Sequence, residues 1–376
     1  MIDFNSLGNE YETPLYVYAG EEIEKRIGII KNVFKDFDYK IFYAMKANAN
    51  PELLKILSKN KIGADIVGPG EFIAARRGKI EDILWNGNGK TTKDQKFFME
   101  NGLKYVVIDS FEEISMWENT DIIKLLRVNP DVDAKTHPHI STGLKIHKFG
   151  VPLDKIEKVK DKIHGLHLHI GSQITDVNPY IEAFDKAIDV ILRNNYNFLD
   201  IGGGWGIDYD GPGLNIEEYQ SKVIPVLKRF KGKLLLEPGR FIIGPSGYLL
   251  LKVVQVKKTP EKYFIVSDGG MNVLIRPSLY SAHHEIEVIS PVSDEEYKCD
   301  FVGPLCETGD ILGKNRISKI PEIGSYILIK NSGAYGYSMA NNYNGMPKPA
   351  EVLSYEGKIK IIRKREKLED LLKGCN

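Results

Sequence analysis

Eight short apolar runs alternate with helical patterns between about residue 40 and residue 245, and this alternation most constrains the fold. Apolar and β-branched residues fill each run, which is typical of parallel strands buried on both faces. Eight such units in roughly 200 residues predict an α/β fold, a (β/α)8 barrel of the TIM type. A doubly wound open sheet is the alternative, although it usually has fewer strands. The eight runs are Lys40–Ala44, Gly63–Val67, Asp82–Trp85, Lys104–Ile108, Ile122–Val128, Gly165–Ile170, Phe198–Ile201 and Lys233–Glu237.

Amphipathic helical patterns follow most of these runs. Pro51 suits the first turn of a helix, and the apolar residues that follow it lie on one helical face. Acidic residues stand near several helix starts, where they interact favourably with the helix dipole. The clearest helical patterns are Pro51–Lys59, Gly70–Arg77, Lys93–Glu100, Asn178–Arg193 and Ile216–Phe230.

The pattern changes after Gly247, where strand-like runs follow one another with only loops between them. Such a run of strands predicts a C-terminal antiparallel β-sandwich or β-barrel domain. Leu15–Tyr18 also reads as a strand, and we expect it to join that domain. The predicted domains are therefore a barrel at 24–246 and a discontinuous β domain at 1–23 plus 247–376. The later runs are Tyr248–Val256, Tyr263–Ser267, Glu285–Ile289, Asp300–Val302, Tyr326–Lys330 and Lys358–Ile362.

Composition excludes several classes of protein. The 51 Lys and Arg residues balance 51 Asp and Glu residues, and a net charge of 0 argues against a nucleic-acid binder. The three cysteines are odd in number and fit no zinc motif, which is typical of a reducing compartment. The N-terminus shows no signal-peptide pattern. The longest apolar stretch, Phe241–Leu251, contains Gly and Pro and is too short to span a bilayer. We therefore expect a cytoplasmic protein that binds neither membrane nor nucleic acid.

Unusual residues stand at the carboxyl ends of the predicted strands, where barrels of this kind carry their chemistry. Lys46 directly follows the first strand. Most lysines are solvated surface charges. A lysine in a barrel mouth is instead desolvated, which makes its amine a nucleophile for carbonyl groups such as that of pyridoxal phosphate.

The seventh and eighth strands end in residues suited to an anionic cofactor. A glycine-rich turn, Gly202–Gly206, follows the seventh strand, and Gly239 follows the eighth. Backbone N–H groups there can hold a phosphate, although a tight turn alone also explains the glycines. Glu237 could stabilise a protonated pyridine nitrogen, or it could only pair with Arg240.

His167 and His169 lie two residues apart on the sixth predicted strand, so both face one side of it. A metal pair is one interpretation, but no further histidines or paired carboxylates gather at the matching strand ends, and we expect no metal. A planar imidazole stacked on a planar cofactor suits His169 better. His167 could be an ordinary core histidine.

The predicted β domain carries a second set of polar residues. Arg276 begins a segment that reads Arg-Pro-Ser-Leu-Tyr, and an arginine fork recognises carboxylates. Cys306 and Glu307 follow a Gly-Pro turn. Cys306 is either a proton donor or a small buried hydrophobic residue. Glu307 could hold a substrate ammonium or be simply exposed.

Taken together, these motifs resemble the diaminopimelate branch of the alanine-racemase-fold, pyridoxal-phosphate-dependent amino-acid decarboxylases. The similarity runs nearly end to end, from Thr13-Pro14-Leu15-Tyr16 to Pro349-Ala350-Glu351-Val352. Each motif alone is weakly specific, but the ordered set is highly specific. In order, the motifs are Tyr43-Ala44-Met45-Lys46-Ala47-Asn48, His169-Ile170-Gly171-Ser172-Gln173, Gly202-Gly203-Gly204-Trp205-Gly206, Glu237-Pro238-Gly239-Arg240 and Cys306-Glu307-Thr308-Gly309-Asp310.

The resemblance implies a role for each site residue. Lys46 would carry pyridoxal 5'-phosphate, His169 would stack on its ring, and Glu237 would pair with its ring nitrogen. Asp65 would line the cofactor side. The phosphate would be held by Ser172, Gly203, Gly239 and Arg240, with Tyr335 nearby. The distal carboxylate of the substrate would be bound by Arg240, Arg276 and Tyr280.

The resemblance also implies a homodimer with shared active sites, in which the partner subunit supplies Cys306 and Glu307. Glu307 would grip the distal amino group of a small amino-acid substrate, and Cys306 or Lys46 would protonate Cα. The implied reaction is decarboxylation of meso-2,6-diaminopimelate to L-lysine and CO2.

Other functions remain open at this stage. The nearest alternatives are sister decarboxylases acting on ornithine, arginine or carboxynorspermidine. Those that produce simple diamines have no second substrate carboxylate to bind, so they would not need the residues that bind one here. A racemase would need a second base opposite Lys46. A non-catalytic cofactor carrier with this barrel would lack the β domain, and a metallohydrolase is the remaining alternative.

Overall fold

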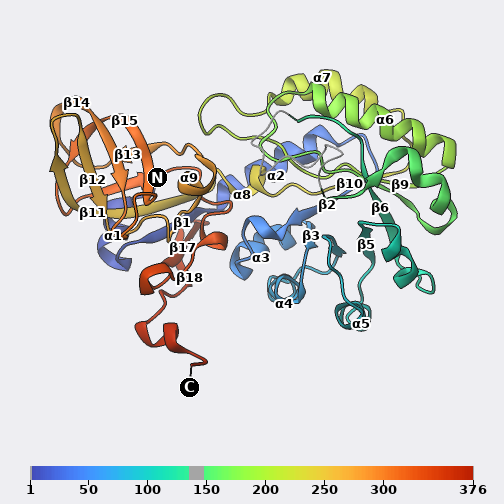
Figure 1. Ribbon diagram of the computed structural model, residues 1–376, viewed down its shortest axis with the longest axis horizontal. Helices are drawn as coiled ribbons and strands as arrows, with labels where there is room; N and C mark the ends of the chain where they lie inside the picture. Colours follow the sequence, from blue (N-terminus) through green and yellow to red (C-terminus); the bar gives the residue numbers. More distant parts are fainter. Residues whose placement is uncertain (1, 135–147, 376) are drawn as a thin grey trace. The chain divides into compact units, whose positions relative to one another are not determined.

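Eight parallel strands in the computed structural model close into a barrel (Figure 1). Each strand pairs with the next one along the chain, and β10 returns to pair with β2, so the predicted barrel is confirmed and the open sheet is excluded. The structure describes residues 2–134 and 148–375. The barrel strands are β2 (Tyr39–Ala44), β3 (Gly63–Ile66), β4 (Ile83–Trp85), β5 (Tyr105–Ile108), β6 (Ile123–Asn129), β8 (Gly165–His167), β9 (Phe198–Asp200) and β10 (Lys233–Leu236).

Large side chains from several strands fill the barrel. Phe42, Leu84, Tyr105, Leu125 and Leu235 belong to one buried cluster. Each comes from a different strand, so the cluster ties the two halves of the barrel together. The barrel is therefore a packed core rather than a pore, and chemistry is confined to its rim.

Helices cover the outside of the barrel, and their apolar faces follow the expected period. Pro51 opens α3, and the Asn50 side chain caps it by accepting from the Glu52 N–H at 3.0 Å. Helices α6 and α7 lie side by side (Figure 1), joined by the rings of Tyr180 and Tyr219. In the described parts of the chain, no helix is both long and apolar enough to cross a membrane. The helices are α2 (Gly20–Val33), α3 (Pro51–Lys59), α4 (Pro69–Arg77), α5 (Thr92–Glu100), α6 (Asn178–Asn194), α7 (Ile216–Leu227) and the short α8 (Arg240–Ile243).

The chain divides into two compact units. The barrel unit comprises Glu24–Asp208 and Pro212–Ile242, and the β unit comprises Met1–Ile23, Tyr209–Gly211 and Ile243–Asn376. A small helix, α1 (Phe4–Tyr11), precedes β1 in the β unit. Segments from both ends of the chain thus build one unit.

The β unit is a mixed sheet in which β1 lies between β11 and β17. Most neighbours are antiparallel, but β1 and β17 are parallel, as are β12 and β14. Leu15, Val17, Leu250, Leu328 and Val352 form its core. Its strands are β1 (Leu15–Ala19), β11 (Gly247–Lys258), β12 (Tyr263–Ser267), β13 (Ile286–Val288), β14 (Pro291–Val302), β15 (Ile311–Pro321), β16 (Tyr326–Ile329), β17 (Ala350–Tyr355) and β18 (Lys358–Arg363).

Two strands of this sheet, β15 and β17, and most of β14 were absent from the sequence prediction. Charged residues interrupt the apolar pattern of β14 and β15, whose middle parts are largely exposed. Strand β17 contains Glu351, which is fully buried although glutamate is an ionisable residue. Apolar periodicity cannot find strands whose side chains face water or pair with a distant partner.

Glu351 is held by partners from two other strands. It accepts a hydrogen bond from the Tyr18 hydroxyl at 2.8 Å and pairs with the Arg363 guanidinium. Because the carboxylate is buried, removal of the arginine would leave a charge without its counter-ion.

We expect Arg363→Met to destabilise the β unit by about 1 to 3 kcal/mol, the usual cost of leaving a buried acceptor without its donor, because only the Glu351 carboxylate of the pair is fully buried. The control is Lys330→Met, whose partners Glu285 and Glu287 are exposed, so its cost should stay below about 1 kcal/mol. Urea unfolding followed by circular dichroism measures both. Equal losses in the two variants would show that Glu351 does not depend on Arg363.

Candidate active site

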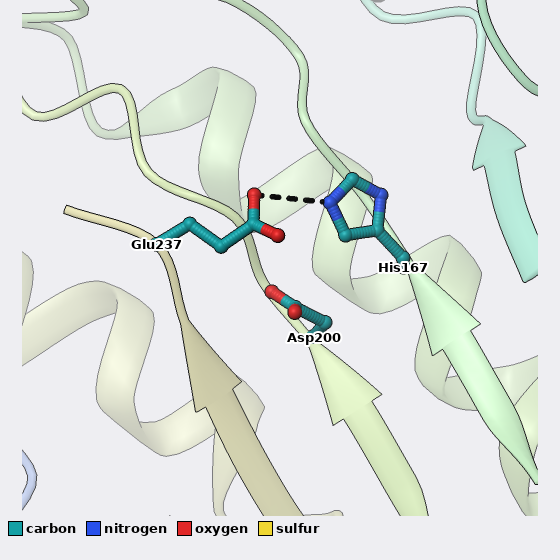
Figure 2. A group of neighbouring side chains, drawn as sticks. All are labelled: His167, Asp200 and Glu237. Carbon is teal, nitrogen blue, oxygen red and sulfur yellow. Dashed lines mark hydrogen bonds and ion pairs between the residues drawn. The ribbon is translucent and has the colours of Figure 1, made fainter. Parts of the chain in front are cut away.

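Polar residues of the barrel unit gather at the carboxyl ends of its strands. Glu237 follows β10, and His167 and Asp200 are the last residues of β8 and β9. Figure 2 shows these three side chains pointing toward one another from neighbouring strands. Parallel strands closed into a barrel bring their ends to one rim, so residues far apart in sequence meet there.

Both oxygens of Glu237 have hydrogen-bond partners. Its Oε2 lies 3.1 Å from His167 Nε2, and its Oε1 accepts from the Asn86 side-chain amide at 2.8 Å. All three residues are buried. A buried carboxylate with two donors is a preorganised negative group.

The three buried carboxyl groups at this rim differ in the direction in which their pKa values are shifted. Burial and the charge of Glu237 raise the pKa of Asp200 well above its usual range, and the same causes raise the pKa of Asp65. Burial acts on Glu237 too, but the charge and hydrogen bond of His167 and the charge of Lys46 hold its pKa below the ordinary value. Glu237 is therefore the ionised member of the group.

His169 is half-buried, and its Nδ1 accepts a hydrogen bond from the Gly203 N–H at 3.5 Å. Burial, followed by the positive charges of Lys46 and Arg127, holds its pKa well below the usual range. The imidazole is thus neutral and presents an uncharged face.

The glycine-rich turn requires glycine for steric reasons. Gly202 and Gly204 have φ of 64° and 100°, which favour glycine. A Cβ on Gly203 would lie 2.3 Å from the Glu237 carbonyl oxygen. The turn therefore packs directly against the chain that follows β10, and its Gly202 and Gly203 N–H groups face the rim, where they donate to Asp200 Oδ1 and His169 Nδ1.

Hydrogen-bond donors gather beside this turn. The Arg240 Nη2 donates to the Ser172 hydroxyl at 3.0 Å, and the Arg240 side chain is buried. Gly239 packs against Ala44 and Ala47, where a Cβ would meet both methyl groups within 3.2 Å. The structure thus brings together the segments that carry Ser172, Gly203, Gly239 and Arg240.

Lys46 lies in the 3₁₀ turn Met45–Ala47 directly after β2, at the expected rim. Its side chain is exposed, whereas Met45 and Ala47 are buried. In the single chain Lys46 is therefore exposed at the open end of the barrel, not desolvated as expected. Its charge still acts on Asp65, Glu237 and His169.

In the β unit, Arg276 opens the short helix α9 (Arg276–Tyr280) and is buried. Its Nη1 lies 2.7 Å from His284 Nε2, and its guanidinium stacks 4.6 Å from the centre of the Tyr209 ring. Tyr280, at the end of the same helix, is half-buried. A guanidinium held from two sides keeps a fixed orientation.

Cys306 and Glu307 are exposed on the loop Gly303–Asp310. Buried Asp310 shapes this loop by accepting from the N–H groups of Leu305 and Met271 at 2.8 and 2.6 Å. The Ser278 hydroxyl of α9 donates to the Gly309 carbonyl at 2.6 Å, which ties the loop to the helix that carries Arg276. The interpretation of Cys306 as a buried core residue is therefore wrong.

Tyr335 also belongs to the β unit. It is half-buried and has φ of 58°, in the left-handed region that non-glycine residues seldom occupy. The predicted site residues thus form two sets, one in each unit.

Sequence reasoning missed Asn86 and Asp200 and treated His167 as core. Each stands at the carboxyl end of a barrel strand, which is the signal that could have found them. It also assumed that no carboxylates gather near the histidines, whereas ligand atoms of His167, Asp200 and Glu237 lie within 4.8 Å of one another. The hydrogen bond between His167 and Glu237 accounts for the proximity of these two groups.

Known proteins resemble this chain over almost its whole length. The family profile for the pyridoxal-binding domain of pyridoxal-dependent decarboxylases matches residues 20–244. Diaminopimelate decarboxylase of Aquifex aeolicus is 38% identical over 388 residues, covering 97% of this chain and 92% of that protein. The enzyme of Campylobacter jejuni is 37% identical, covering 98% and 97%.

Solved structures agree with these relatives. Helicobacter pylori diaminopimelate decarboxylase in complex with L-lysine has a TM-score of 0.92 at 35% identity, covering 99% of this chain and 98% of that one. A lysine/ornithine decarboxylase from Vibrio vulnificus has a TM-score of 0.82 at 20% identity, covering 93% and 96%, and shares only the fold.

The raised pKa of Asp200 generates a stability prediction. As the pH rises above the usual value of 3.8, the unfolded chain releases a proton that native Asp200 keeps, so the native state loses about 1.4 kcal/mol per pH unit until the raised pKa is reached. Asp200→Asn cannot ionise, and its Oδ1 can still accept from the Gly202 N–H. The variant should therefore gain stability over the wild type as the pH rises.

Thermal unfolding at a series of pH values measures this difference. Asp154→Asn, at an exposed position, should show no such trend. A constant difference between Asp200→Asn and the wild type would mean that native Asp200 is ionised.

Proposed function

The chain belongs to the pyridoxal-dependent decarboxylases, and we propose that it removes one carboxyl group of meso-2,6-diaminopimelate as CO2 and leaves L-lysine. One observation carries this proposal. The diaminopimelate decarboxylases match 97–98% of the chain, so the similarity includes the β unit as well as the barrel that the whole family shares.

The donor set in the barrel unit fits pyridoxal 5'-phosphate. Its ring nitrogen needs an anion, and Glu237 is buried and ionised. Its phosphate needs several donors, and the Ser172 hydroxyl, the Arg240 guanidinium and the backbone of the glycine turn are suited to supply them. The neutral imidazole of His169 suits one face of an aromatic ring.

When bound, pyridoxal phosphate supplies a ring that accepts the electron pair left behind as CO2 departs. We assign the covalent attachment to Lys46, whose exposed amine can reach an incoming carbonyl. Glu237 keeps the ring nitrogen protonated, and His169 holds the ring from one side. Asp65 lines the same side of the site.

The phosphate end is assigned to Ser172, to the backbone of Gly203 and Gly239, and to Arg240, with Tyr335 close to it. Bare backbone N–H groups suit a dianion because they add positive dipoles without the entropy cost of ordering long side chains. The packing of Gly203 and Gly239, which leaves no room for a side chain, supports this role.

The far end of the substrate is assigned to Arg240, Arg276, Tyr280 and Glu307. Support for Arg276 comes from its fixed orientation, because an arginine already held by His284 and Tyr209 loses little entropy when it binds a carboxylate. Glu307 would bind the distal ammonium. Cys306 or Lys46 would then return a proton to Cα.

We further propose that two copies of the chain share each active site. Cys306 and Glu307 are exposed on the single chain, as expected of groups that act in the site of a partner. We propose that the partners of the chain are a second copy of itself and the small amino-acid substrate, and that neither nucleic acid nor a membrane takes part.

A substrate panel tests the function. Meso-diaminopimelate carries both an ammonium and a carboxylate at its far end, whereas ornithine and arginine lack that carboxylate. Because an unpaired buried arginine is costly, kcat/KM for meso-diaminopimelate should exceed those for ornithine, arginine and carboxynorspermidine by roughly 100-fold or more. Release of CO2 measures each rate. A faster reaction with one of the other three would assign the chain to a sister decarboxylase.

The two exposed cysteines offer a matched pair of variants. Cys306→Ala should lower kcat by about 100-fold, the usual contribution of one positioned acid, while the cofactor stays bound. Cys375→Ala, near the C-terminus, should leave kcat unchanged. Turnover and cofactor absorbance are measured together. If Cys306→Ala keeps full activity, Lys46 is the remaining proton donor.

A further inference from the structure

The carboxylate of Glu237 is held by two side chains that the proposed reaction leaves without a role. His167 comes from the end of β8, and Asn86 follows β4, which lies three strands away from β8 in the barrel order. Their nitrogen atoms lie 3.1 and 2.8 Å from the two Glu237 oxygens, and the exposed fractions of the three residues are 0, 8 and 5%. The protein thus buries a complete three-residue network at the place where Glu237 must act.

The hydrogen bonds assign the direction of each donor. The Asn86 Oδ1 accepts from the Gly87 N–H at 2.7 Å, so its amide nitrogen must face Glu237. His167 Nε2 faces Glu237 Oε2, which can only accept, so Nε2 carries a hydrogen. His167 Nδ1 is buried and has no hydrogen-bond partner in the described residues, so the ring directs its hydrogen bonding at this network. Figure 2 shows the imidazole edge turned toward the carboxylate.

We infer that His167, with Asn86 beside it, is a positioning residue that holds Glu237 as an anion, so that the proton it shares with the cofactor stays on the ring nitrogen. This inference rests on the proposed function. Each donor stabilises the charged carboxylate over the neutral acid and so makes Glu237 a weaker base. A weaker base leaves the proton on its partner.

The electrostatics of the neighbouring residues agree with this role. Burial alone would raise the pKa of Glu237, as it does for Asp65 and Asp200 at the same rim, but His167 and Lys46 reverse the direction. The pKa values of Asp200 and Asp65 stay raised, so both carboxyl groups favour the neutral form. The difference between Glu237 and its two neighbours therefore follows the position of His167.

The consequence concerns the electron-withdrawing power of the cofactor. A pyridine ring accepts electrons strongly only while its nitrogen is protonated. If Glu237 were the stronger base, the proton would move to the carboxylate and the ring would become neutral. His167 acts only through Glu237, and substrate binding should not depend on it.

The test compares His167→Leu, which removes the donor, with His167→Gln, whose side-chain amide can still donate to Glu237. Each holoenzyme is reconstituted with pyridoxal phosphate labelled with ¹⁵N at the ring nitrogen, and its NMR shift reports protonation directly. We expect a protonated nitrogen in the wild type and in His167→Gln, and a shift toward the neutral form in His167→Leu. In His167→Leu, kcat for meso-diaminopimelate should fall roughly 10- to 100-fold, the usual loss when a residue that orients an active-site group is removed. KM should stay within about twofold of the wild-type value, because His167 does not bind the substrate.

His164→Leu is the matched control. His164 precedes β8 at the opposite end of the strand, where its Nδ1 accepts from the Lys124 N–H at 3.0 Å. Its ¹⁵N shift should equal that of the wild type. If His167→Leu does not fold, Asn86→Ala removes the other donor with a smaller change in volume, and the same shift toward the neutral form is expected.

A protonated nitrogen in whichever of these donor-removing variants folds would overturn the inference. So would one equivalent of zinc in the purified wild type that is lost in His167→Leu, because the cluster would then be a metal site. A wild type that binds no pyridoxal phosphate, or leaves meso-diaminopimelate intact, would instead refute the proposed function. The two failures are therefore distinguishable.

Discussion

The pairing of β10 with β2 is the contact on which the site depends. It closes the barrel, with Leu234 opposite Tyr39 and Leu236 opposite Ile41. The same pairing continues into the loops, where the Ala44 N–H donates to the Pro238 carbonyl at 3.3 Å. Closure therefore brings the chain that carries Glu237 alongside the chain that leads to Lys46, although nearly two hundred residues separate them.

The second constraint is electrostatic. Three carboxyl groups are buried at one rim, and mutual repulsion in a poorly solvated place prevents all of them from ionising. Hydrogen bonds from His167 and Asn86 select Glu237 as the anion. A site that must hold a cationic ring beside an anionic phosphate thus starts from one localised negative charge and a separate group of donors around Ser172 and Arg240.

The β unit is stabilised by a different kind of interaction. Ion pairs of buried carboxylates, such as that of Glu351 with the more exposed Arg363, join its strands, and Asp310 shapes the loop that presents Cys306 and Glu307. These interactions involve charged residues. The unit is therefore stabilised by pairs that a search for apolar periodicity does not detect.

The sequence alone determined the barrel, because eight apolar runs of buried parallel strands have few other arrangements, and its ordered motifs indicated the family and the reaction. It also placed Lys46, His169 and Glu237 at the barrel rim, since each closely follows an apolar run that forms a barrel strand. Only the tertiary structure revealed that Asn86, His167 and Asp200 surround Glu237, that Lys46 is exposed, and that β15 and β17 belong to the sheet. The reason is that exposure, ionisation and hydrogen-bond partners depend on the distances between strands, which a linear pattern of residue types does not contain.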